Sequence, residues 1–225
     1  MIVTIAEETD RNIQQDVLDE LDWDPEVEVT DVGVEVDDGV VTLTGTVESY
    51  AKKGASEQAA LRVAGVRAVA NDIEVKLLGS TTKTDTDIAK AVANAFEWNT
   101  SVSFEKIGIT VEDGRVTLGG EVEWNYQRTA AENAARRVAG VKSVINLITI
   151  KARPASAEEV RTKIERALVR SAEVDADTIR VRSENRHVTL SGTVRAWAEK
   201  KEAEDAAWRA PGVTKVTNNI RVQIM

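Results

Sequence analysis

A short strand pattern that contains a glycine occurs three times in this 225-residue chain. The copies are VTLTGTV at residues 41–47, VTLGGEV at 116–122 and VTLSGTV at 188–194. They lie 75 and 72 residues apart, and the same offsets align features far from the strand, as in a repeated folding unit. The pattern therefore predicts three tandem units, which we place at residues 1–79, 80–152 and 153–225.

Each unit is expected to begin with an amphipathic helix. Thr9, Thr84 and Ser156 occupy equivalent positions and are residue types that cap the start of a helix. Apolar residues follow at a four-residue spacing, which places one narrow apolar stripe along each helix. The stripe residues are Ile13, Val17 and Leu21, then Ile88, Val92 and Phe96, then Val160, Ile164 and Leu168.

Two strands joined by a tight turn are expected next, because apolar and polar residues alternate there. The turns at residues 37–39 and 112–114 end in glycine and predict a hairpin. The third turn, at residues 183–186, has no glycine, so we expect a different geometry there. Gly45, Gly120 and Gly192 fall inside the following strand, which favours a packing role or a bulge over a phosphate-binding loop, since no helix begins directly after them.

A second helix with a small-residue face is expected to end at Gly65, Gly140 and Gly212, and a final strand follows. Asn71, Asn146 and Asn218 lie in phase with the apolar residues of that strand, so each should point inward and find hydrogen-bond partners in its own unit. Each unit is thus predicted to be an αββαβ domain of the α+β class, with two helices on a small mixed three-stranded sheet. The links at residues 79–83 and 152–155 are short, so neighbouring units are expected to touch.

The charge and composition exclude several classes of protein. The net charge is −9, and acidic against basic counts are 18 to 6, 9 to 9 and 11 to 14 in the three units. This balance disfavours nucleic acid, and most charges are expected to be solvated. No apolar run is long enough to cross a bilayer. The first twelve residues lack the features of a secretory signal, so we expect a cytoplasmic location as the sequence stands, or a periplasmic one if a signal peptide was removed.

The sequence contains no constellation of catalytic residues. His187 is the only histidine, there is no cysteine, and no serine lies in a G-x-S-x-G pattern, so we predict a protein that is not an enzyme and needs no cofactor. A weak alternative is a K⁺ or Ca²⁺ site built from acidic residues of the first unit. The candidates are Asp22, Asp24, Asp37 and Asp38, but their spacing is not that of an EF-hand, and a solvated acidic surface is favoured.

Aromatic residues gather where the glycine-containing strand passes into the second helix. These residues are Tyr50, Trp124, Tyr126 and Trp197. Trp and Tyr favour surfaces that are part apolar and part wet, so this edge is a candidate for binding lipid headgroups or client proteins, with help from Arg195, Lys200 and Lys201. The favoured alternative is that the same rings seal one unit against the next. Trp23 and Trp98 are expected to pack locally, and Trp208 to face a neighbouring unit.

The order of elements and the motifs resemble the BON domain. The resemblance lies in the three glycine-containing strands, in AGV, AGV and PGV at the end of the second helix, and in the final strand with its asparagine. It covers nearly the whole chain, and the tandem arrangement is similar to the osmotically induced periplasmic proteins of this family. The resemblance implies a role in envelope stress, attachment to phospholipid surfaces and assistance to other proteins, and potassium binding in one cytoplasmic member; it implies no catalytic residues.

The resulting hypothesis is a non-enzymatic, stress-associated protein that attaches to anionic phospholipid surfaces or to client proteins. The alternatives are a cytosolic cation sensor that binds K⁺ or Ca²⁺, and a self-associating structural protein.

Overall fold

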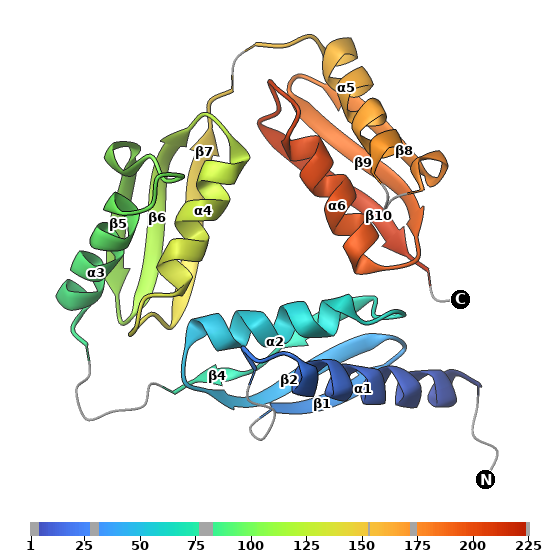
Figure 1. The fold of residues 1–225 in the computed structure, drawn as a ribbon, viewed down its shortest axis with the longest axis horizontal. Coiled ribbons are helices and arrows are strands. Elements are labelled where there is room, and N and C mark those ends of the chain that lie inside the picture. The colour runs from blue at the N-terminus through green and yellow to red at the C-terminus, as the bar shows by residue number, and fades with distance from the viewer. Residues whose placement is uncertain (1–4, 28–31, 77–82, 153, 172–174, 224–225) are drawn as a thin grey trace.

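The computed structural model describes residues 5–27, 32–76, 83–152, 154–171 and 175–223, which form three units of like architecture. The helices are α1 (Ile5–Trp23), α2 (Tyr50–Arg62), α3 (Asp85–Glu97), α4 (Asn125–Arg136), α5 (Ala157–Arg170) and α6 (Trp197–Trp208), with 3-10 turns at Phe104–Lys106 and Ala176–Thr178. The strands are β1 (Val32–Asp37), β2 (Val40–Val47), β3 (Ala68–Asn71), β4 (Glu74–Val75), β5 (Ile107–Glu112), β6 (Arg115–Val122), β7 (Ser143–Ile150), β8 (Ile179–Glu184), β9 (His187–Val194) and β10 (Lys215–Val222). The units stand at the sides of a triangle, with α2, α4 and α6 facing its centre (Figure 1).

The glycine-containing strand is the central strand of its own sheet in every unit. β2, β6 and β9 pair antiparallel with the strand before them and parallel with the last strand of the unit. In the first unit the last strand is divided into β3 and β4, both of which pair with β2. The three sheets are separate, which confirms three repeated α+β domains.

The predicted apolar stripes form the three cores. All nine stripe residues of the first helices are buried, and each group packs with the central strand and the second helix of its own unit. Small residues on the second helix, such as Ala59, Ala135 and Ala207, are fully buried because they let the helix lie close to the sheet. Each unit therefore completes its own core.

Steric constraints explain why glycine occupies the central strand in the second and third units. Gly120 and Gly192 have φ of 133° and 139°, and a Cβ on them would overlap the carbonyl oxygens of Lys106 and Thr178. Gly45, in the first unit, has a similar φ of 121°. A residue with a side chain could adopt neither this backbone conformation nor this close approach without strain.

The three asparagines tie the last strand to the second helix. The Asn146 side chain donates to the carbonyl oxygen of Arg128 at 3.2 Å and to Glu132 at 3.0 Å, and accepts from the Ile148 amide at 3.2 Å. Asn71 and Asn218 make the same three bonds in their units. The predicted inward orientation and local partners are thus confirmed.

Two local predictions are wrong. Thr84 and Ser156 cap α3 and α5, but Thr9 lies inside α1, which begins at Ile5, because good helix formers precede it and nothing stops the helix. The third hairpin turn does not differ in geometry. Asn185 and Arg186 have φ of 48° and 65°, close to the 47° and 73° of Asp38 and Gly39.

Within the described residues, no helix combines the length and the apolar character that a membrane span requires.

Candidate functional site

The three units meet through equivalent positions of α2, α4 and α6. The first and the twelfth residues of these helices lie at the junctions between units. The guanidinium of Arg136 lies over the ring of Tyr50, 5.3 Å from the centre of that ring. Asn125 and Trp208 line the same cavities between the second and third units. Trp197 packs against the core of the first unit, as does Leu61, and both line the central cavity. The three contacts together close a ring.

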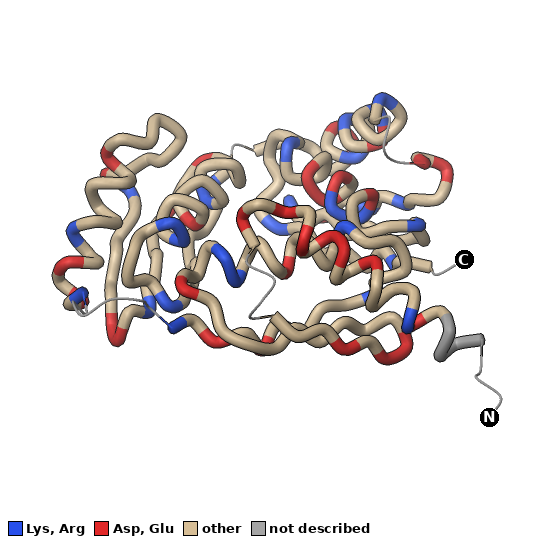
Figure 2. The backbone as a smooth tube through the Cα atoms, turned by 60° about the horizontal axis from the view of Figure 1, so that its bottom comes forward, with Lys and Arg blue, Asp and Glu red and all other residues tan. Residues whose placement is uncertain are grey.

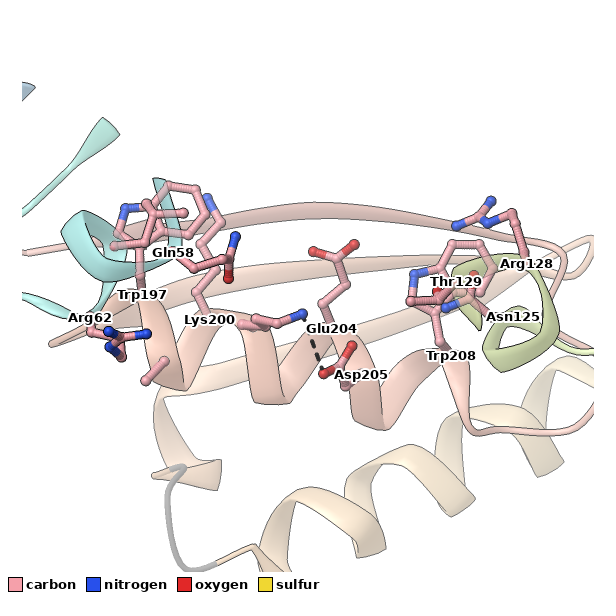
Figure 3. A pocket seen from close by; sticks show the side chains of 13 residues that line it. Gln58, Arg62, Asn125, Arg128, Thr129, Trp197, Lys200, Glu204, Asp205 and Trp208 are labelled. Carbon is pink, nitrogen blue, oxygen red and sulfur yellow. Dashed lines mark ion pairs between the residues drawn. The ribbon is translucent and has the colours of Figure 1, made fainter. Parts of the chain in front are cut away.

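A cavity of about 390 Å³ lies at the centre of this ring (Figure 3). Arg128 lies over the ring of Trp208 at 4.8 Å, and the Lys200 ammonium lies over the ring of Trp197 at 4.5 Å. Burial lowers the pKa of both Arg128 and Lys200. Glu132 and Glu204 oppose that effect at Arg128, and Glu204 opposes it at Lys200. The lining of the cavity has a basic excess, because four basic side chains face two acidic ones: Arg62, Arg128, Lys200 and Lys201 against Glu204 and Asp205.

The predicted aromatic residues fall into two groups. Tyr50 and Trp197 are partly buried at contacts between units. Trp124 and Tyr126 are exposed at the start of α4, on the outside of the ring contact. Trp208 faces the second unit, as predicted.

Two further exposed aromatic residues lie at the same end of the second unit. This end is where α3 finishes and α4 starts (Figure 1). Gln127 holds its parts together, because its side chain accepts from the Trp124 amide at 3.0 Å and donates to Ser103 at 2.7 Å. The exposed fractions are 86% for Trp98, 41% for Phe104, 39% for Trp124 and 60% for Tyr126. We call these four residues the aromatic end of unit 2.

Trp23 and Trp98 do not pack locally as expected. Trp23, the last residue of α1, is 83% exposed, and Trp98, which directly follows α3, is 86% exposed.

The basic residues near the aromatic end are not the ones that the sequence suggested. Lys106 and Lys151 flank it, and their nearest carboxylates are loosely placed, at 3.9 Å for Glu123 and 3.6 Å for Glu121. Across the described chain, both signs of charge are interspersed in every unit (Figure 2).

The three predicted basic residues lie in the third unit, and each has a partner there. Arg195 donates to Glu199 at 3.0 Å, and Lys201 is 3.7 Å from Asp205. Lys200 covers Trp197.

The acidic candidates for a cation site do not converge. Asp24 binds Arg62 at 2.6 Å, and this bond lowers the pKa of Asp24 and raises that of Arg62. Asp38 binds Arg67 at 2.7 Å at the hairpin turn. Asp22 and Asp24 lie at the end of α1, and Asp37 and Asp38 lie near its start; among the described residues no group of acidic or histidine side chains could hold a metal ion.

His187 has a structural environment. Its Nε2 is 2.7 Å from the hydroxyl of Thr217 on the neighbouring strand, and that hydroxyl and the ring tie β9 to β10.

The comparison with known families rests on this repeated geometry. The family described as the BON domain matches residues 9–76, 84–152 and 156–224. The chain belongs to the BON family. The resemblance seen in the strand, the helix end and the asparagine is therefore confirmed, in three copies.

One curated relative of this BON protein is osmotically-inducible protein Y of Escherichia coli strain K12. The two are 33% identical over 134 residues, which cover 56% of this chain and 64% of the relative. The matched region thus spans less than two thirds of that relative's length.

Two solved structures of CdsD, a structural protein of the type III secretion system of Chlamydia trachomatis, also align with the chain. Their identities are 15% and 14% and their TM-scores 0.28 and 0.27; they cover 95% and 93% of this chain, and 93% and 96% of the CdsD chains are covered. Scores this low support no inference about function.

Sequence reasoning missed Trp98 and Phe104 as surface residues, and Arg128 as the partner of Trp208. A signal for Trp98 does exist, because it stands between a predicted helix end and the polar residues Asn99, Thr100 and Ser101. No local sequence pattern predicts the pairing of Arg128 with Trp208, since this pairing depends on how the second and third units are placed.

Proposed function

We propose that this BON protein is a non-enzymatic, stress-associated protein that attaches to membranes containing anionic phospholipid through the aromatic end of unit 2. The observation that carries the proposal is the exposure of Trp98, Phe104, Trp124 and Tyr126 at one end of a single unit. The equivalents of Trp124 and Tyr126 are Ser49 and Ala51 in the first unit and Ala196 and Ala198 in the third, so the cluster is not a general property of the repeat. The name of the curated relative supports the association with osmotic stress.

The physical basis is the preference of Trp and Tyr for the membrane–water interface. Their rings insert among headgroups while their polar atoms stay hydrated. Lys106 and Lys151, on either side, add attraction to anionic headgroups of about 1 kcal/mol each at the surface, and salt screens that attraction. The overall charge of −9 opposes anionic membranes, so we expect weak and salt-sensitive attachment.

Vesicle co-sedimentation tests the proposal. The full chain is mixed with vesicles of phosphatidylcholine alone or with phosphatidylglycerol added, at low and high salt. We expect binding only with phosphatidylglycerol, and weaker binding at high salt. The double variant Trp98→Ala/Tyr126→Ala should bind roughly tenfold less, since it loses two interfacial rings.

Trp23→Ala is the matched control, because Trp23 is equivalent to Trp98 and similarly exposed, whereas Tyr50, the aromatic residue at the start of α2, is partly buried under Arg136. It should bind like the unmodified chain. Equal binding by the double variant, or no binding to anionic vesicles at low salt, contradicts the proposal; suppression of client aggregation without vesicle binding would favour a protein ligand instead.

A further inference from the structure

The outer face of the sheet in the second unit is apolar at its centre. Along β6, Val116 and Leu118 point to the helices and are buried, so Thr117 and Gly119 face the other side. Two rows of residues in register cross that outer face (β5, β6 and β7 in Figure 1). The rows are Gly108, Gly119 and Leu147, and next to it Thr110, Thr117 and Ile145.

The first row places a protruding side chain beside a hollow. Leu147 is 61% exposed and its neighbour Ile145 is 41% exposed. A Cβ built on Gly119 meets no other atom within 4 Å, and one on Gly108 meets only the carbonyl oxygen of Gly119, at 3.8 Å. The backbone of the two glycines is therefore open from outside, and a leucine from another molecule fits above it.

The other two units lack this combination. Leu147 corresponds to Asp72 and Asn219, Ile145 to Ala70 and Thr217, Gly119 to Thr44 and Ser191, and Gly108 to Gly33 and Arg180. Thr110 corresponds to Glu35 and Arg182. The outer face of the third unit thus carries arginines, which would repel an identical surface, and that of the first carries acidic residues.

The face is complementary to itself. It has both the projection and the hollow, so a two-fold axis satisfies both contacts at once, as an isologous interface requires. Charges lie only at its ends, where acidic and basic side chains lie side by side. Glu112 lies opposite Arg115, and Glu121 lies 3.6 Å from Lys151. An apolar centre with a balanced polar rim is the usual anatomy of a protein interface.

We propose that a second copy of this chain docks sheet-to-sheet on the outer face of unit 2, with Leu147 of each copy over Gly108 and Gly119 of the other. The face shares Lys151 with the surroundings of the aromatic end of unit 2, but its apolar centre contains none of the four aromatic residues, so the inference does not depend on membrane attachment.

The face is small for a protein interface. Its three strands have six, eight and eight residues. At about 3.3 Å per residue and about 4.8 Å between strands, they cover roughly 350 Å² per copy. The two copies bury roughly 700 Å² in total, below the roughly 1,200 Å² of a stable interface. The dimer is therefore weak, with a dissociation constant of roughly 10 µM to 1 mM, and forms where the protein is concentrated.

Sedimentation velocity of the full chain, from about 10 µM to about 1 mM, tests the inference. The unmodified chain should shift from monomer to dimer over this range. The double variant Ile145→Thr/Leu147→Asn removes the projection by using the residues that the third unit carries at Thr217 and Asn219, so the fold of the unit tolerates them. Its dimer should be at least tenfold weaker.

Gly119→Ser fills the hollow and leaves Leu147 in place. The third unit has Ser191 there, so this variant also suits the fold, and it should weaken the dimer as well. The reverse graft Thr217→Ile/Asn219→Leu in the third unit is the control. It should add no association, because Arg180 occupies the position of the hollow.

A chain that stays monomeric at about 1 mM overturns the inference, as does a dimer that all these variants leave unchanged. Capture of a different protein or of vesicles by this face, with no dimer, also overturns it, because the occupant would then not be a second copy.

Discussion

At the scale of single residues, the inward asparagine shows how one side chain joins two elements. Asn146 needs its amide as a donor, because it faces the carboxylate of Glu132 and the carbonyl oxygen of Arg128. Asn146→Asp replaces that donor with a second carboxylate, which raises the pKa of the new Asp above its usual value near 4. We expect β7 to lose roughly 2–3 kcal/mol of local stability at pH 7, and less as falling pH protonates the new group and restores a donor. Hydrogen exchange of the β7 amides at pH 7 and near pH 5 measures the local stability of β7 at each pH.

Asn146→Ala is the control for that variant. It removes the same bonds without a charge, so its cost of roughly 1–2 kcal/mol should change little over the same pH range. If the Asp variant shows no more pH dependence than the Ala variant, the predicted contact with Glu132 does not govern stability at this position.

Arg186 has a strained backbone conformation at a position where the other two units have glycine. It has φ of 65°, where Gly39 and Gly114 have φ of 73° and 76°. A left-handed conformation strains a residue with a side chain, and glycine removes that strain but gains freedom in the unfolded chain. Arg186→Gly should therefore raise the free energy of unfolding by roughly 0.5–1 kcal/mol, seen as a higher melting temperature of the third unit. The converse change Gly114→Arg should lower the free energy of unfolding, since a Cβ on Gly114 lies 3.0 Å from the carbonyl oxygen of Gly140. A lower melting temperature for Arg186→Gly would show that the backbone of Arg186 is not strained.

At the scale of elements, an aspartate ties the first helix to the hairpin in two of the three units. The carboxylate of Asp85 accepts from the amides of Asp113 and Gly114 at 2.9 Å each, and Asp10 does the same for Asp38 and Gly39. Ala157 stands at this position in the third unit. Asp85→Ala should cost roughly 1–2 kcal/mol, because two turn amides lose their acceptor.

The reverse change tests the same tie in the opposite direction. Ala157→Asp should stabilise the third unit, since its turn has the same backbone geometry and presents the equivalent amides. Thermal unfolding of both variants, followed unit by unit by hydrogen exchange, should show shifts of opposite sign. Two shifts of the same sign would mean that the carboxylate does not act through the turn.

The elements were largely predictable from the sequence, because their signals are local. The buried stripe at Ile88, Val92 and Phe96 follows from helical spacing, and the asparagine follows from strand alternation. The tie from Asp85 was not predictable, because it joins residues 28 and 29 positions apart through a loop whose position only the packed helix determines. The exposed position of Trp98 was missed for a related reason, since periodicity marks the buried face of a helix and says little about the residue that follows its last turn.

At the scale of the whole molecule, the repeat predicts three like units but not the ring that they form. Tyr50, Asn125 and Trp197 are equivalent in position, yet each makes a chemically different contact with the next unit. The same is true of their partners, Leu61, Arg136 and Trp208. A local pattern cannot encode such pairs, because each depends on the placement of a unit roughly 70 residues away. The sequence alone therefore could not show which aromatic residues at the junctions form contacts between units and which form an exposed end.

Each contact between units buries a polar atom. Among the described side chains, Asn125 Oδ1, Arg136 Nε and Trp197 Nε1 are buried without a hydrogen bond to another protein atom, one for each contact between units. Contacts between domains of one chain are already modest, so a ring held in this way is poised to open at its weakest point.

That point is the contact between the third and first units, because no link joins them directly. The other two contacts are held by short links, which keep their surfaces at high effective concentration. Trp197→Ala removes the ring that packs against the first unit and should cost roughly 2–3 kcal/mol, comparable with the whole strength of such a contact. We expect small-angle scattering to show a larger radius of gyration for this variant, while circular dichroism stays unchanged because each unit has its own core. Trp208→Ala should increase the radius of gyration less, because the link at residues 152–155 keeps the second and third units together. Trp23→Ala should leave the radius of gyration unchanged, because Trp23 is exposed. If Trp197→Ala has the same radius of gyration as the unmodified chain, other contacts close the ring.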